Sequence, residues 1–310
     1  MQWYKGTLHC HTNHSDGLAK PFQVGHFYRI QGHDFLGVSD HNRYTPTELY
    51  AASSGLLGVP CCEYSDYMSC HVLSIGVTED LRPGPRDGAT KYIPHELLQE
   101  GIDKTLAAGG LPVVCHPLWN WAVDADDMLQ LKNCHHFEVC NAGPSCNAFP
   151  IPGYEPIDEL WDRLLSAGHR YYGLANDDAH EYFYPPILRA AMGGIGYNVV
   201  RIPELTVEHV IEAIRHGRFY ASSGIHLAEY RVTGNGITIK LQQQQKERTV
   251  FQFFGHGGRE LKKVVGQEAD YTFNGDENYV RIRIASTAGL WAWTQPVFLD
   301  DLADAINWTK

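Results

Sequence analysis

The chain has 310 residues, 44% of them hydrophobic and 20% charged, a composition that supports a sizeable buried core. Its formal net charge of −11 argues against long nucleic acid as a partner, because surfaces that bind polyanions are usually basic. No apolar run reaches the roughly 20 residues needed to span a bilayer. The first residues also lack the basic and apolar segments of a signal peptide. We therefore expect no membrane contact.

The eight cysteines are scattered, with neither a disulfide framework nor the spacing of a zinc finger. Free thiols suit a reducing compartment, so we expect a cytoplasmic protein. The expected partner is a small molecule. The acidic charge does not exclude an anionic one, because bound cations can reverse the local field of a site. The sequence leaves open whether the chain forms a homo-oligomer.

The first two thirds of the chain alternate strand-like and helix-like segments. The pattern predicts strands near 3–8, 35–40, 111–115 and 171–176, and helices over 21–32, 94–110, 156–170 and 206–218. Three of these helical segments open with Pro, and several end at Gly. Such alternation favours parallel strands covered by helices, an α/β architecture in the form of an open sheet or a barrel.

The pattern of hydrophobic and polar residues changes near Gly224. Beyond it the chain consists of short alternating runs separated by Gly and Asn, which predict an antiparallel sheet or small sandwich. We therefore divide the chain into a first domain over residues 1–225 and a small β-rich domain over residues 226–310.

Possible metal ligands follow the predicted strands of the first domain. The stretch "LHCHTNHSDG" places His9 and His11 on one face of a strand end, with Asp16 in the following turn. The other strand ends carry, in chain order, Asp40-His41, Glu63, His116, Glu138, and Asp177, Asp178 and His180. The carboxyl ends of such strands are where α/β proteins bind ligands, and imidazole with carboxylate suits Zn, Mn or Fe.

His71 begins a strand instead of ending one. The link from Glu63 is too short for a parallel crossover, so a hairpin is expected to bring His71 back beside Glu63. Taken singly, each of these residues also fits a turn or a paired, buried side chain. For Glu138 a buried, paired carboxylate is the alternative. His26, His33 and His95 are interpreted as surface residues, and His136 as structural.

In order and type, these residues resemble the motifs of the PHP family, named for its polymerase and histidinol phosphatase members. The short strings "GRFYASSG" and "WAWTQPVF" further resemble a stand-alone branch that includes carbaryl-hydrolase-like proteins. The family resemblance implies a distorted (β/α)7 TIM-like barrel, followed here by the small antiparallel β domain. It also implies two or three divalent ions (Zn, Mn or Fe).

The resemblance assigns the ligands as follows. One ion would take His9, His11, Glu63 and Asp178; a second would take Glu63, His71 and His116; a third would take Asp16, His41 and His180. Glu63, Asp178 and His180 would be the catalytic residues. Asn176-Asp177 stands where the family often has Gly-Ser, which leaves the role of Asp177 open.

These implications predict a metal-dependent phosphoesterase that hydrolyses a small phosphorylated metabolite or nucleotide through a metal-bridging hydroxide. One alternative is a metal-dependent hydrolase of a carbamate, ester or amide. An alternative of another class is a non-catalytic, metal-stabilised binding module.

Substrate contacts are predicted from position alone. Arg43 and Arg189 follow ligand motifs and suit a phosphate group, although a surface ion pair is an equal alternative for each. Trp119 and Asn120 lie in a segment expected to overhang the site, where they would contact an aromatic group or form a packed lid.

Overall fold

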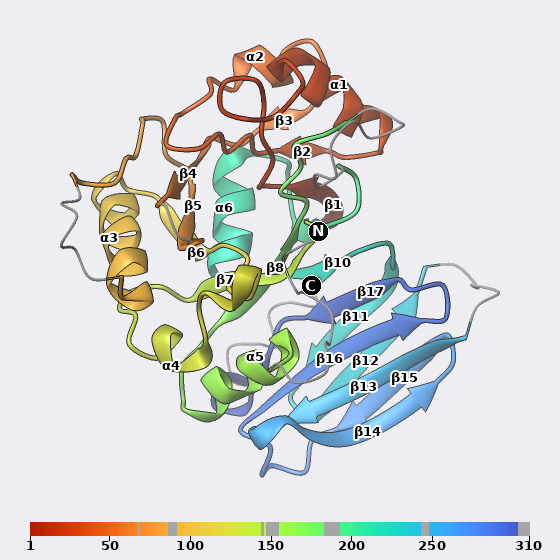
Figure 1. Ribbon diagram of the computed structural model, residues 1–310. Helices are drawn as coiled ribbons and strands as arrows, with labels where there is room; N and C mark the ends of the chain where they lie inside the picture. The colour runs from red at the N-terminus through yellow and green to blue at the C-terminus, as the bar shows by residue number, and fades with distance from the viewer. Residues whose placement is uncertain are drawn as a thin grey trace.

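The structure is a computed structural model that describes residues 1–66, 69–85, 92–143, 146, 155–182, 193–242 and 248–302 (Figure 1). The helices of the described residues are α1 (Pro21–Ile30), α2 (Glu48–Ala51), α3 (Pro94–Ala107), α4 (Ala125–Met128), α5 (Ile157–Ser166) and α6 (Val207–Arg215). Within the described residues, none of these helices combines the length and apolar character needed to cross a bilayer.

One sheet has the order β4-β5-β6-β7-β8. Its strands are β4 (Cys61–Ser65), β5 (His71–Ile75), β6 (Leu111–Val114), β7 (His136–Asn141) and β8 (Tyr172–Asn176). Strands β4, β5 and β6 pair antiparallel, whereas β6, β7 and β8 pair parallel. Ser65 lies opposite His71, which confirms the predicted hairpin.

A longer sheet of ten strands has the order β14-β13-β16-β17-β10-β9-β1-β2-β3, with β18 paired to β16. Its strands are β1 (Gln2–Thr7), β2 (Phe35–Leu36), β3 (Leu57–Gly58), β9 (Tyr197–Ile202), β10 (Phe219–Ser222), β13 (Thr249–Gly255), β14 (Arg259–Val265), β16 (Tyr279–Ser286), β17 (Trp291–Thr294) and β18 (Val297–Phe298). A third sheet, β11-β12-β15, consists of β11 (Leu227–Thr233), β12 (Gly236–Leu241) and β15 (Glu268–Thr272).

The predicted (β/α)7 barrel is wrong. The strands of the described residues form three separate sheets and no closed ring. Strands β3 and β4 follow one another in the chain but lie at the ends of different sheets. Strands β8 and β9 are also consecutive and belong to different sheets. Antiparallel pairs such as β1–β9 and β4–β5 also replace the parallel pairs that a barrel with crossover helices requires.

The helices begin and end near the Pro and Gly residues from which the sequence predicted their limits. Pro21 opens α1 and Pro94 opens α3, where the missing proline N–H costs nothing. Helix α3 is followed by Gly109 at φ 77°, a backbone angle that glycine adopts without strain. Helix α5 turns its apolar side, including Leu160 and Trp161, toward the core.

The chain beyond residue 225 contributes strands to two facing layers (blue in Figure 1). Apolar residues of β12, β13 and β16, such as Ile239, Phe253 and Ile282, fill the space between them. All strand pairs of this part are antiparallel. Strand pairing crosses the predicted boundary, because β10 pairs with β17. The division into two domains stays a prediction.

A buried ion-pair network also joins the two parts. The fully buried Arg281 of β16 bonds to Asp158 at 2.8 Å and to Asp162 at 2.6 Å, and both acids lie on α5. The Tyr279 hydroxyl donates to the same Asp162 carboxylate. Removing one partner of such a pair leaves a buried charge and typically costs about 3–5 kcal/mol.

Candidate metal centre

The structure brings all nine predicted ligand side chains into one cluster. In each contact a ring nitrogen of a histidine lies within 4.0 Å of a carboxylate oxygen of another member of the set. Most of the nine residues follow the last residue of a strand (β1, β2, β6 or β8), whereas Glu63 lies in the middle of β4 and His71 begins β5. His41 is held against Glu63 by an isolated parallel bridge, and Cys10 against Ala179 by another.

The inner part of the cluster, here called the floor, consists of His9, Glu63, His71, His116 and Asp178. These side chains are at most 13% exposed. Glu63 is the hub, because five imidazole nitrogens surround its two oxygens. The distances are 3.3 Å to His9, 3.5 Å to His11, 2.7 Å to His41, 3.0 Å to His71 and 3.4 Å to His116.

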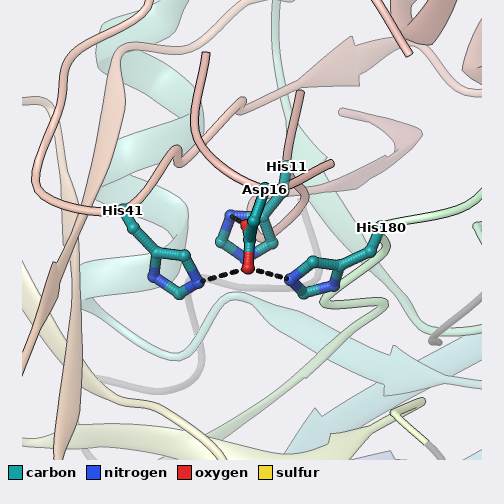
Figure 2. A group of neighbouring side chains, drawn as sticks. All are labelled: His11, Asp16, His41 and His180. Atoms are coloured by element: carbon teal, nitrogen blue, oxygen red, sulfur yellow. Dashed lines mark ion pairs between the residues drawn. The ribbon is translucent and has the colours of Figure 1, made fainter. Parts of the chain in front are cut away.

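The outer part, here called the mouth, consists of Asp16, His41 and His180. Figure 2 shows the Asp16 carboxylate between the two imidazole rings, with His11 behind it. Oxygen Oδ2 of Asp16 lies 3.5 Å from Nε2 of His41 and 3.4 Å from Nε2 of His180. The Asp16 side chain is 55% exposed, so this part of the cluster opens to solvent.

The arrangement of the nitrogen and oxygen atoms suits coordination of divalent ions better than hydrogen bonding between the side chains. Nε2 of His9 lies 3.3 Å from Glu63 and 3.2 Å from Asp178, yet within the described residues it makes no hydrogen bond. Oε2 of Glu63 is likewise close to imidazoles without an aligned bond. Two ligands that are each about 2.1 Å from one ion lie about 3.0–3.4 Å apart, and they point at the ion and not at each other.

Two backbone carbonyls behind the histidines orient the rings of His180 and His71. Nδ1 of His180 bonds to the Asp178 carbonyl at 2.8 Å, which leaves Nε2 facing Asp16. Nε2 of His71 bonds to the Asp66 carbonyl at 3.1 Å, which leaves Nδ1 facing Glu63. A bond of this kind on one ring nitrogen presents the lone pair of the other nitrogen to a metal.

In the metal-free cluster, the carboxylates and imidazoles shift one another's pKa values. The neighbouring His41 and His9 hold the pKa of Glu63 well below its usual value, even though burial acts in the opposite direction. Burial works against a charged His41, but Glu63 and Asp16 outweigh it and raise the pKa of His41 to about 10. Burial and the neighbouring His41 lower the pKa of His11 to about 4. A cation that binds here must displace protons from imidazoles.

The donors group somewhat differently from the predicted three sets. His11 stands with Asp16, His41 and His180, and His41 also stands with Glu63 and His71. The thiol of Cys115, which the sequence did not single out, joins His9 and Glu63. Burial raises the pKa of this thiol well above its usual value, so it is neutral in this setting. The assignment of ligands to individual ions stays a prediction.

The predicted substrate contacts are dispersed. The Trp119 ring packs edge-on against His116 at 5.0 Å and His71 at 5.5 Å between ring centroids, so it borders the floor. The side chain of Asn120 donates to Ser69 Oγ at 3.3 Å. Arg43 is exposed and its Nη1 lies 3.4 Å from the His14 carbonyl. The prediction for Arg189 falls outside the described residues.

Two acids that the sequence placed at strand ends have roles that it left open. Glu138 is buried and its Oε1 lies 2.7 Å from Nδ1 of His9, so it contacts a predicted ligand. Asp177 is absent from the cluster: it accepts bonds from the Tyr28 hydroxyl and from the backbone N–H groups of residues 194–196. The Asp–Asp pair at the end of β8 thus divides between the metal centre and the backbone that returns to β9.

No family model matches the chain, and no curated protein matches it. Among solved structures, the chain is similar to a two-domain protein from Bacteroides vulgatus that contains a predicted PHP-like metal-dependent phosphoesterase. The match has a TM-score of 0.53 and 14% sequence identity, and it covers 96% of this chain and 95% of that chain. At this identity the likeness concerns the fold. It supports the PHP resemblance at the level of the fold, while the carbaryl-hydrolase-like branch stays a prediction.

Proposed function

We propose that the protein is a metal-dependent hydrolase of small, anionic phosphate esters, such as a phosphorylated metabolite or nucleotide. The observation that carries the proposal is the Glu63 hub, which has five imidazole nitrogens around one buried carboxylate and a solvent-open Asp16 beside it. The phosphoesterase named in the similar solved structure agrees with this class of reaction.

In this proposal the ions are Zn, Mn or Fe, because the donors combine imidazole with carboxylate. His9, His11, Glu63 and Asp178 would hold one ion, Glu63, His71 and His116 a second, and Asp16, His41 and His180 a third. When bound, such ions lower the pKa of water to give a nucleophile near neutral pH and neutralise charge on a phosphate group.

The residues of the chain then have separate tasks. Glu63, Asp178 and His180 are the proposed catalytic residues, since each would contact a bound ion. The burial of the floor keeps bulk water from its carboxylates, which strengthens every electrostatic interaction there. The mouth admits the phosphate group, because Asp16, His41 and His180 are the partly exposed donors.

The organic part of the substrate is assigned to a cavity of about 450 Å³ beside the mouth. It is lined by Asn42, Ser65, Asp66, Arg82, Pro83, Gly84 and Pro85. Ser65 Oγ lies 2.5 Å from Nδ1 of His41, and the Asp66 carbonyl bonds to His71, so the cavity shares a wall with the metal centre. Arg82 offers a guanidinium for an anionic group.

The test is a hydrolysis screen of the protein reconstituted separately with Zn, Mn and Fe, against phosphate monoesters, phosphodiesters and carbamates. We expect phosphate release from small monoesters or diesters, and its loss on removing the metal with a chelator. Turnover of carbamates alone would contradict the proposal in favour of a carbonyl hydrolase. Full metal loading without any turnover would favour a non-catalytic binding module.

A further inference from the structure

Glu138 of β7 is a fully buried carboxylate that stands behind His9, on the side of the ring away from Glu63 and Asp178. Four groups surround its two oxygens. Oε1 lies 2.7 Å from Nδ1 of His9 and 2.9 Å from Nδ2 of Asn176; Oε2 lies 2.8 Å from the backbone nitrogen of His116 and 2.8 Å from Nδ2 of Asn141.

Three of these four groups can only donate. The His116 contact is a backbone N–H. The amide of Asn176 cannot be reversed, because its Oδ1 already accepts from the backbone nitrogen of Leu8 at 3.0 Å. The amide of Asn141 is fixed in the same way, because its Oδ1 accepts from the backbone nitrogen of Gly143 at 2.9 Å. The orientation of both amides therefore follows from backbone donors.

Because the other three groups donate, the contact with Nδ1 of His9 is the only one in which Glu138 could itself donate a proton. Imidazole is more basic than carboxylate, so the proton lies on His9, which donates from Nδ1 while both oxygens of Glu138 accept. We propose that Glu138 is a positioning residue that fixes His9 in the tautomer whose Nε2 lone pair faces Glu63 and Asp178. Glu138 also bonds the backbone of His116, whose φ of 25° is unusual for a residue other than glycine, and so holds a second donor in place.

The inference rests on the metal-binding part of the proposed function, and it predicts a specific failure of Glu138→Gln. The glutamine oxygen satisfies His116 and Asn141 only if its NH2 group faces His9. His9 would then accept at Nδ1 and carry its proton on Nε2, where it blocks the ion. In the reverse orientation, the NH2 group faces the backbone N–H of His116 and the NH2 group of Asn141, which are both donors and leave it without an acceptor. The isosteric variant thus conflicts with the hydrogen bonds of the site in either orientation.

The experiment measures Zn²⁺ affinity by competition with a chromophoric chelator, in the wild type, Glu138→Gln and Glu138→Asp. We expect Glu138→Gln to weaken binding of one ion by about 10- to 100-fold. Glu138→Asp retains an acceptor-only carboxylate and should keep more affinity than Glu138→Gln. A role in packing predicts the opposite order, because glutamine preserves volume and aspartate leaves a cavity.

Asp162→Asn is the matched control. Asp162 is also a buried, multiply bonded carboxylate, but it pairs with Arg281 and Tyr279 away from the cluster. It should lower the unfolding temperature without changing Zn²⁺ affinity. Wild-type Zn²⁺ affinity in folded Glu138→Gln, or greater affinity in Glu138→Gln than in Glu138→Asp, would overturn the inference.

Should Glu138→Gln fail to fold, the ring ¹⁵N spectrum of the zinc-loaded wild type decides. The signal of His9, assigned by its loss in His9→Gln, should show a proton on Nδ1; a proton on Nε2 would overturn the inference. Neither measurement depends on turnover. If the affinities follow the expected order but no phosphate ester is hydrolysed, the proposed function fails and the role of Glu138 stands. If a phosphate ester is hydrolysed but the affinities do not follow the expected order, the role of Glu138 fails and the proposed function stands.

Discussion

The floor and the mouth of the cluster use the same side-chain types in opposite surroundings. His9 and Glu63 of the floor are fully buried, whereas the Asp16 side chain of the mouth is 55% exposed. Bonds to Glu138 and to the Asp66 carbonyl orient His9 and His71 of the floor, while Asp16 contacts only the imidazoles around it among the predicted ligands. The comparison teaches that one cluster of candidate metal ligands can combine buried donors with donors that are open to solvent.

The largest effect is expected from Glu63→Gln in the floor. Glutamine removes the charge of the hub and leaves several imidazoles and two ions with less compensation. We expect metal content to fall and turnover to drop by more than about 100-fold, the typical loss for one electrostatic element. Elemental analysis and steady-state kinetics check this. Full metal content with near-normal turnover would show that Glu63 does not bridge ions.

A smaller effect is expected from Asp16→Asn in the mouth. Because Asp16 is assigned to one ion only, metal content should fall by about one ion per chain while the floor keeps its own. Turnover should fall less than in Glu63→Gln, mainly through weaker phosphate binding. If Asp16→Asn also removed the ions assigned to the floor, the floor and the mouth would not bind metal independently, and the prediction would be wrong.

A still smaller effect is expected at the cavity beside the mouth. Arg82 is exposed and paired with Asp80 at 2.9 Å. Arg82→Gln should raise KM for an anionic substrate by about 2- to 12-fold, the equivalent of about 0.5–1.5 kcal/mol, with kcat nearly unchanged.

The matched control is Arg231→Gln, since Arg231 is also paired with an acid two residues before it, Glu229, but lies on β11. Equal KM changes in the two variants would contradict the assignment of the cavity to substrate.

Two buried histidines outside the cluster, His33 and His136, should make the stability of the fold depend on pH in a way that His9 of the cluster does not. Carboxylates outweigh burial and raise the pKa of His9, whereas burial lowers the pKa of His33 and of His136 to about 3. These two are neutral when folded and titrate near 6.5 when unfolded. Their contribution is complete above pH 6.5, and stability should fall toward pH 3 by up to about 1.4 kcal/mol per pH unit for each.

Chemical denaturation of the metal-free protein between pH 7 and 5 checks this. His33→Phe should show a shallower fall than the wild type, and His26→Phe, at an exposed position of α1, should not. An unchanged slope in His33→Phe would contradict the neutral state of His33.

The sequence predicted the helices and the clustering of the nine side chains better than the pairing of the strands. Helix limits follow from local signals such as Pro94 and Gly109, and strand-end ligands follow from residue type and order. The antiparallel pairing of β1 with β9 joins segments about 190 residues apart and leaves no local trace. The barrel was therefore inferred from resemblance and proved wrong.

Residue-level errors have the same origin. The surface assignment of His33, made because it lies in a helical or turn segment, is wrong: His33 is fully buried against Tyr28 and Tyr197. The contact of Glu138 with His9 was also out of reach, since a single acid on an apolar strand predicts burial with a partner but does not say which partner.

The pairing of β10 with β17 has a consequence for any attempt to shorten the chain. Truncation after residue 225 would remove β17 and expose the backbone N–H and C=O groups on that edge of β10, as a template for pairing with another molecule. It would also leave Asp158 and Asp162 without Arg281. The isolated first part should therefore aggregate, and the C-terminal strands act as a built-in cap against self-association.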